Sequence, residues 1–101
     1  MTYQLVLQWA ASSLADDDRL IRIEDTLIAG ITEQHEVDGH DEGSGEMNIF
    51  IRTDDPLAAF ERIRGILDRD TLKSVRVAYR EVSGSTYTVL WPKDLTNFTV
   101  A

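Results

Sequence analysis

The segment DGHDEGSGEMNIFI, residues 38–51, constrains the fold of this chain more than any other. Its second half alternates polar residues with Met47, Ile49 and Ile51, which is the pattern of a strand with one buried face. Glycine and serine precede that strand, as they do where a chain turns back on itself. The segment therefore predicts a β-hairpin, and the register of this hairpin decides which polar side chains share a face.

The parity of the strand selects one register for the hairpin. Its apolar residues have to face the core, because polar or charged residues alternate with them. A loop of Gly43-Ser44-Gly45, with a left-handed glycine at its end, keeps the apolar residues together. This loop also turns His40 outward, opposite Asn48, and Asp38 outward, opposite Phe50. The pairs that this register predicts are Glu42 with Glu46, Asp41 with Met47, Gly39 with Ile49 and Val37 with Ile51.

Three further segments alternate apolar and polar residues and are predicted to be strands. Their apolar positions are Tyr3, Leu5, Leu7 and Trp9 in the first, Val75, Val77 and Tyr79 in the next, and Tyr87, Val89 and Trp91 in the last. Pro92 ends the last strand, because proline cannot donate a hydrogen bond to a neighbouring strand. Residues 92–101 are therefore expected to form a tail or a short edge segment.

Two segments carry apolar residues at the spacing of an amphipathic helix. Both are preceded by residues that cap helices. The caps are Ser12, Ser13, Asp16 and Asp17 for the first helix and Asp54-Asp55-Pro56 for the second. The residues expected to face the core are Leu20, Ile23, Leu27 and Ile31, widened by Ile21 and Ile28, in the first helix, and Leu57, Phe60, Ile63 and Leu67 in the second.

The predicted elements follow one another as strand, helix, strand, strand, helix and strand, with one added strand. This order resembles the ferredoxin-like, split βαβ arrangement, an α+β two-layer sandwich with an antiparallel sheet. Over residues 3–91 the chain resembles the small, uncharacterised bacterial proteins of that fold, and it shows no diagnostic catalytic motif. We expect one domain spanning 1–101, with its core in 3–91. Both helices carry a single apolar stripe, so they are expected to cover one face and leave the other open.

The chain is strongly acidic, with 18 acidic and 10 basic residues and a net charge of −8. A field of that sign repels phosphate backbones and anionic membrane surfaces, and it attracts basic proteins. The chain contains no cysteine, which excludes disulfides and thiol chemistry. We find no signal peptide and no run of about 18 apolar residues, the length that a membrane span needs. A soluble, cytoplasmic protein that binds neither nucleic acid nor membrane is expected.

The open face of the predicted sheet collects three arginines, although the chain as a whole is acidic. In the ferredoxin-like order the first and third strands are central, so alternate residues of neighbouring strands share this face. The predicted ligand or partner face consists of Gln4, Gln8, His40, Asn48, Phe50, Arg52, Arg76 and Arg80. Two interpretations stay open. The arginines pair with Asp38 and Glu46 across strands, or they recognise a carboxylate, a phosphate or an acidic patch.

The residues around the hairpin match no catalytic or metal-binding motif well. Asp38 and His40 resemble the start of a calcium loop, but Ile49 stands where that loop needs a glutamate. A transition-metal site at His40 would need further ligands such as Glu46 or His35. The glycine-serine-glycine turn lacks the lysine and the following helix of a phosphate loop. We therefore predict no catalytic residues, no metal site and no cofactor.

These observations favour a non-enzymatic protein-interaction or regulatory domain that binds through the open face of its sheet. A basic protein is the expected partner, because opposite charge steers association. The alternative is a small anionic-ligand-binding module or a minor enzyme, which would use the arginines of this face and His40. A homodimer that buries Val6 and Phe50 is a third possibility. The resemblance implies a ligand-sensing regulator, a dimeric small-molecule enzyme, or an adaptor or toxin-neutralising immunity protein.

Overall fold

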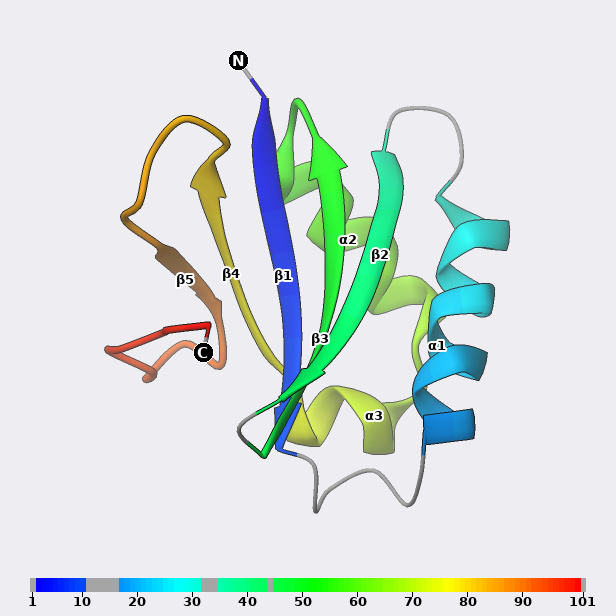
Figure 1. Ribbon diagram of the computed structural model, residues 1–101. Helices are drawn as coiled ribbons and strands as arrows, with labels where there is room; N and C mark the ends of the chain where they lie inside the picture. The colour runs from blue at the N-terminus through cyan, green and yellow to red at the C-terminus, as the bar shows by residue number, and fades with distance from the viewer. Residues whose placement is uncertain (1, 11–16, 32–34, 44, 101) are drawn as a thin grey trace.

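The computed structural model describes residues 2–10, 17–31, 35–43 and 45–100. Their elements are β1 (Tyr3–Ala10), α1 (Asp17–Gly30), β2 (His35–Gly43), β3 (Glu46–Thr53), α2 (Pro56–Ile66), α3 (Arg69–Ser74), β4 (Arg76–Glu81) and β5 (Thr88–Trp91) (Figure 1). All strand pairs are antiparallel, and the order across the sheet is β2-β3-β1-β4-β5. In the part of the chain described here, no helix is long and apolar enough to cross a membrane.

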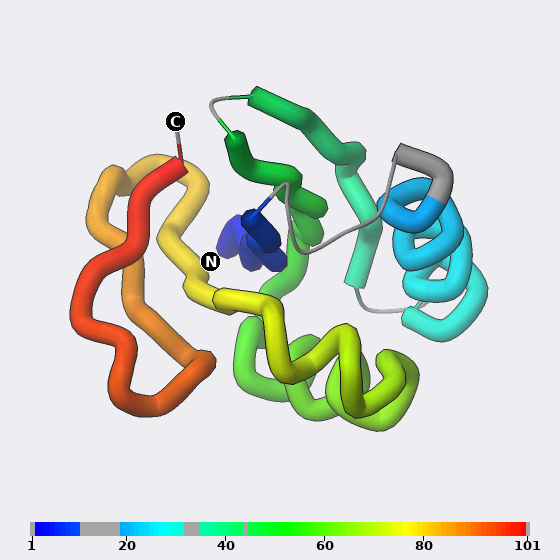
Figure 2. Tube along the Cα trace, turned by 90° about the horizontal axis from the view of Figure 1, so that it is seen from below, coloured from blue at the N-terminus to red at the C-terminus, as the bar shows by residue number. Residues whose placement is uncertain are grey.

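Helices cover only one side of the sheet. α2 and α3 lie on that side, and α1 lies alongside β2 (Figure 2). The chain after β5 loops past the edge strand, and its last residues return over the opposite side, where Thr99 accepts a hydrogen bond from Gln8. We call the side toward the helices the inner face and the opposite side the outer face. The expected α+β fold with an antiparallel sheet is confirmed, and α3 is an addition to the predicted elements.

The strand β1 lies in the middle of the sheet, between β3 and β4, and its successive side chains point to opposite faces. Leu5, Leu7 and Trp9 point to the inner face and are completely buried in the core. The predicted apolar residues of β3 join them there. Burial of an aliphatic or aromatic side chain of this size contributes about 1.5–3 kcal/mol. The inner face therefore supplies the main stabilisation, and its parity fixes which side chains the outer face receives.

The helix α1 buries a narrower stripe than its sequence predicts. Leu20, Ile23, Leu27 and Ile31 are buried as expected. The prediction that Ile21 and Ile28 also face the core is wrong, since both are exposed. They lie off the axis of the stripe, and α1 packs at the side of the sheet, where a single row of contacts is sufficient. The caps predicted at Ser12, Ser13 and Asp16 lie outside the described residues, and Asp17 is the first residue of the helix.

The helix α2 begins as predicted but faces the sheet with a different set of residues. The Oδ1 atom of Asp55 accepts a hydrogen bond from the Ala58 N–H at 3.1 Å, which caps the helix. The predicted burial of Leu57 is wrong, since its side chain is 58% exposed. The buried residues of α2, which face the sheet, are Pro56, Ala59, Phe60 and Ile63. Leu57 follows Pro56 directly, and one residue is about 100° of helical rotation, which turns it away from the sheet.

The short helix α3 ties two tryptophans to the inner side of the sheet. Its cap is Asp68, whose Oδ1 atom accepts a hydrogen bond from the Thr71 N–H at 2.7 Å. That backbone hydrogen bond, assisted by the Thr71 hydroxyl and by Arg19, holds the pKa of the Asp68 carboxyl below its usual value. The indole N–H of Trp9 donates to Thr71 O at 3.3 Å. The indole N–H of Trp91 donates to the next carbonyl, of Leu72, at 3.0 Å.

The β2–β3 hairpin has a different register from the predicted one. Val37 lies opposite Ile51 as predicted, but the register shifts by one residue at Asp38. The pairs beyond the shift are Gly39 with Phe50, His40 with Ile49, Asp41 with Asn48, Glu42 with Met47 and Gly43 with Glu46. Asp38 is therefore the extra residue of a β-bulge. Because an extra residue reverses the parity of the strand beyond it, His40 turns to the inner side and Asp41 to the outer side.

Glycine permits both the bulge and the turn. Gly39 has a φ of 122°, a conformation that side chains strongly disfavour. Gly45 has a φ of 78°, so the predicted left-handed glycine before β3 is confirmed. The loop closes at the pair of Gly43 and Glu46, which is tighter than predicted, and Ser44 lies outside the described residues. The bulge offsets this shorter loop, so the apolar residues of β3 still face the core.

Candidate functional site

Three rows of side chains run across the outer face, perpendicular to the strands. Each row takes one residue from each of β4, β1, β3 and β2. The polar row is Arg76, Gln8, Asn48 and Asp41; the apolar row is Ala78, Val6, Phe50 and Gly39; the charged row is Arg80, Gln4, Arg52 and Glu36. Seven of the eight residues predicted for the ligand or partner face stand in these rows, and the exception is His40.

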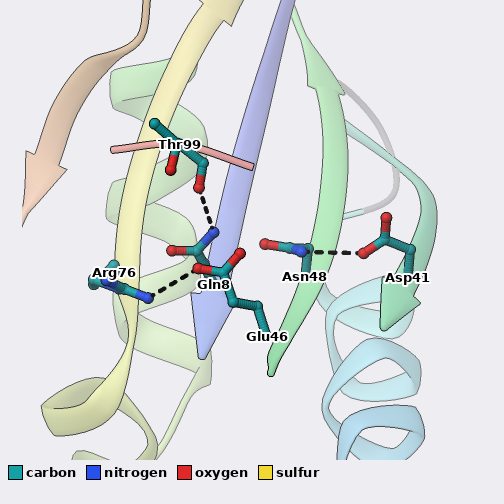
Figure 3. A network of polar contacts seen from close by, with 6 residues as sticks. All are labelled: Gln8, Asp41, Glu46, Asn48, Arg76 and Thr99. Carbon is teal, nitrogen blue, oxygen red and sulfur yellow. Dashed lines mark hydrogen bonds and ion pairs between the residues drawn. The ribbon is translucent and has the colours of Figure 1, made fainter. Parts of the chain in front are cut away.

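The middle of the polar row is buried, although it lies on the side without helices, whereas Asp41 at its β2 end is exposed. Gln8 is 1% exposed and Asn48 is 2% exposed. The Gln8 side chain donates from Nε2 to the backbone oxygen of Thr99 at 2.8 Å, and Asn48 donates from Nδ2 to Asp41 Oδ1 at 3.0 Å (Figure 3). The Oδ1 atom of Asn48 has no hydrogen-bond partner among the described residues. A buried amide oxygen without a donor is costly, and such atoms are rare in folded proteins.

Each of the three arginines of this face already has a partner within the chain. Arg76 Nη2 lies 3.3 Å from Glu46 Oε2, and Arg52 Nη2 lies 4.0 Å from Asp38 Oδ2. Arg80 donates from Nη1 to three backbone oxygens, of Glu81, Val82 and Gly84, at 2.9 to 3.1 Å. Of the two interpretations of the arginines, pairing across strands is the one seen for Arg52 and Arg76. Arg80 instead fixes the turn that follows β4.

The predicted position of His40 on the outer face is wrong. The bulge turns this side chain toward α1, where its Nδ1 atom lies 3.0 Å from both carboxylate oxygens of Glu24. The Glu24 side chain is only 13% exposed and that of His40 is 36% exposed. The pair joins the edge strand to the helix beside it. His40 therefore lies apart from the arginines, and a shared site of His40 and the arginines does not form.

The second histidine, His35, is part of the end of the sheet. Its Nδ1 atom lies 2.6 Å from the hydroxyl of Thr53, which also accepts a hydrogen bond from the Asp55 N–H at 2.9 Å. These contacts link β2 to the start of α2. Within the described ranges, no three histidine, cysteine, aspartate or glutamate side chains are grouped so that they could hold a metal ion.

The end of the segment 92–100, around Phe98 and Thr99, covers the part of the outer face over β4 and β1. Val6 and Ala78 in the apolar row have no exposed surface, and the C-terminal residues cross β4 toward β1 on that side (Figure 3). The ring of Phe98 packs on Tyr87, with 5.0 Å between ring centroids. Phe50, one strand further, keeps part of its surface exposed. We call the uncovered half, over β2 and β3, the hairpin face; it consists of Glu36, Asp38, Asp41, Phe50 and Arg52.

Negative charge is concentrated on the hairpin. Residues 36–46 contain five of the 18 acidic residues and none of the 10 basic ones. This stretch of 11 residues therefore carries −5 of the net charge of −8, with histidine counted as neutral. Three of these acids, Glu36, Asp38 and Asp41, are exposed on the hairpin face. The sequence prediction emphasised arginines on this face; it turned Asp38 outward only as a possible partner of the arginines, and it did not include Glu36 or Asp41.

Two features of the site were accessible from the sequence only in part. An isolated glycine inside a strand pattern is typical of a bulge, so Gly39 is the signal that would have placed Asp41 beside Asn48. Thr99 contributes only a backbone oxygen, which no residue type indicates. Its place over Gln8 depends on the path of residues 92–100 after the turn at Pro92, where Leu95 N–H donates to Pro92 O at 3.1 Å.

The chain has no match among protein-family models, curated proteins or solved structures. The rows of the outer face and their charges are therefore the basis for a functional assignment.

Proposed function

We propose that this protein is a non-enzymatic interaction domain that binds a basic partner protein through the hairpin face. The observation that carries the proposal is the charge of residues 36–46, five acids with no lysine or arginine, on a hairpin that residues 92–100 leave uncovered. Glu36, Asp38 and Asp41 are exposed on one face of this hairpin. Several like charges on one surface create a local potential that attracts a partner of opposite charge.

The hairpin face offers both charge and apolar contact. Asp38 precedes Gly39 and Asp41 follows it by two residues, and the glycine has no side chain to shield Phe50, which lies opposite it on β3. An aromatic ring with acids on the neighbouring strand suits a lysine or arginine side chain, because its aliphatic stem packs on the ring while its charge meets the acids. Exposed ion pairs contribute about 0.2–1 kcal/mol each, so affinity requires several of them together with the ring.

The contacts of the arginines weigh against the alternative of an anion-binding module. Arg76 and Arg80 are held by a carboxylate and by backbone oxygens, so an anion would have to displace those partners. Arg52 is the most exposed of the three, but Asp38 lies 4.0 Å from it and Glu36 lies opposite it on β2, so negative charge already adjoins it. His40, which would have assisted chemistry there, is directed to α1.

The fold assignment that accompanies this proposal is ferredoxin-like, with β5 added at one edge. The order β2-β3-β1-β4 among the first four strands, with helices after β1 and β3, supports it. A cytoplasmic location, with no nucleic acid among the partners, is also part of the proposal, because the chain is acidic and lacks cysteine.

Binding of a short arginine-rich peptide with one central leucine tests this function. We expect measurable binding by titration calorimetry in low salt, and weaker binding at about 0.3 M salt, where charges are screened beyond a few ångströms. The double variant Asp38→Asn, Asp41→Asn should lose affinity about fivefold or more, the equivalent of about 1 kcal/mol or more from two exposed contacts. Phe50→Ala should also weaken binding.

The matched control is the double variant Glu61→Gln, Asp70→Asn, which removes two exposed charges from α2 and α3 on the side of the helices. It changes the net charge without touching the hairpin face, so the affinity should stay within about twofold of the wild type. Equal losses for hairpin and control variants would show that only net charge matters, and the proposal would then be wrong.

A further inference from the structure

The C-terminal residues are held on the outer face by contacts that do not belong to the sheet. The backbone hydrogen bond described within residues 93–100 is the local turn of Leu95 to Pro92. The anchors to the rest of the chain are the Gln8 carboxamide on Thr99 O and the ring of Phe98 on Tyr87. These residues rest on the sheet through side chains, as a bound peptide would.

The surface beneath these residues has the composition of a peptide groove. Val6 and Ala78 form an apolar floor, and Gln8 provides an amide that binds a backbone oxygen. Both apolar residues lie outside the core cluster of the inner face. Tyr87, just before β5, supplies an aromatic wall that receives a ring. An apolar floor with a few polar groups that fix orientation is typical of binding sites.

Residues 95–100 leave one hydrogen-bond acceptor of the polar row without a donor. Asn48 lies next to Gln8 in the row and is almost completely buried, yet its Oδ1 atom receives no donor from the described residues. Figure 3 shows this oxygen directed toward Gln8, with the Glu46 carboxylate drawn beside them, and Gln8 in turn is bonded to Thr99. An occupant with a donor at this point would satisfy a group that the chain's own segment leaves unpaired, and would gain affinity from it.

We infer that the β1–β4 half of the outer face is a binding groove for extended peptide segments, and that residues 95–100 are its exchangeable occupant in the free protein. The segment that fits has an aromatic residue for Tyr87, a backbone oxygen for Gln8 and a hydrogen-bond donor for Asn48. This groove is distinct from the hairpin face, and the inference does not depend on a basic partner.

The test uses the full chain with its own segment weakened, and a labelled synthetic peptide with the sequence of residues 93–101 as the probe. Phe98→Ala removes the ring contact, and Thr96→Ala is the matched control, since Thr96 is exposed on the same segment. By fluorescence anisotropy, the Phe98→Ala protein should bind the probe at least about tenfold more tightly than wild type, because a tethered segment competes at an effective concentration in the millimolar range. Thr96→Ala should behave as wild type.

Further variants assign the contacts. A probe with alanine in place of its phenylalanine should not bind, and adding Gln8→Leu to Phe98→Ala should weaken probe binding about fivefold, as expected for one hydrogen bond. Among probes in which each residue in turn is replaced by asparagine, at least one should bind more tightly, and Asn48→Leu should abolish that gain. Asp38→Asn should leave probe binding unchanged, because Asp38 contacts Arg52 on the hairpin face, and this result separates the groove from that face.

The inference is overturned if the folded Phe98→Ala protein binds the probe no better than wild type. Leu95→Ala provides a second way to loosen the segment if Phe98→Ala does not fold. Loss of folding in both variants would also overturn it, since residues 95–100 would then be a required part of the fold. If no asparagine probe gains affinity through Asn48, the donor requirement is wrong.

Discussion

Substitution of Gly39 by alanine tests the bulge that determines the composition of the outer face. Gly39 has a φ of 122°, and a Cβ atom placed there meets nothing within 4 Å. The cost of Gly39→Ala is therefore conformational strain alone, about 1–3 kcal/mol for such a backbone. Alanine also lowers the conformational entropy of the unfolded chain, which offsets about 0.4–1 kcal/mol of this cost. We expect a net loss of about 1–2 kcal/mol in the free energy of unfolding.

Urea unfolding followed by circular dichroism measures this loss. The corresponding fall in Tm is about 4–8 °C for each kcal/mol in a domain of this size. Gly43→Ala is the matched control, because Gly43 lies in the same strand, has equal space around it and lacks a left-handed φ. Its stability should stay within about 0.5 kcal/mol of wild type. If Gly39→Ala is as stable as Gly43→Ala, the bulge does not require glycine and the reasoning fails.

Three further predictions concern the helices and their attachment to the sheet. Ile63→Ala should cost about 2–5 kcal/mol of unfolding free energy and Leu57→Ala no more than about 0.5 kcal/mol, and similar values for the two would contradict the facing of α2. In a double-mutant cycle of His40→Gln and Glu24→Gln, urea unfolding should give a coupling free energy of about 0.2–1 kcal/mol. If the effects of the two substitutions are simply additive, the pair does not join β2 to α1. Because the pKa of Asp68 is lowered in the folded state, its stabilisation is present above the unfolded pKa near 3.8 and is lost as the pH falls through the lower folded value. The difference in unfolding free energy between wild type and Asp68→Asn should therefore be constant above about pH 5 and shrink in acid, and a difference independent of pH would contradict the cap.

Local periodicity predicted those parts of the fold that depend on neighbouring residues. The inner positions of β1 and β3, such as Leu5 and Ile49, follow from strict alternation, since burial of one face fixes the parity. The start of α2 follows from Asp55 and Pro56, whose chemistry acts within one turn of the helix. The same reasoning placed seven of the eight predicted residues on the outer face.

Longer-range effects account for the errors. The position of His40 depends on a choice between two registers, and Gly39 tolerates the backbone of either one. Gln8 is on the predicted face, yet its hydrogen bond goes to the backbone oxygen of Thr99, which is distant in the sequence and belongs to a segment without a periodic signal. The cost of covering a polar row becomes visible only when the path of those residues is known.

The central claim is that the hairpin face binds a basic partner, and mapping of the bound peptide by NMR tests it most directly. In a titration of isotope-labelled protein with the arginine-rich peptide, backbone amide shifts should move for Asp38, Asp41 and Phe50 and their neighbours in β2 and β3. Amides of α2 and α3 should stay unchanged. Shifts concentrated on the helices, or spread evenly over the acidic surface, would contradict the claim.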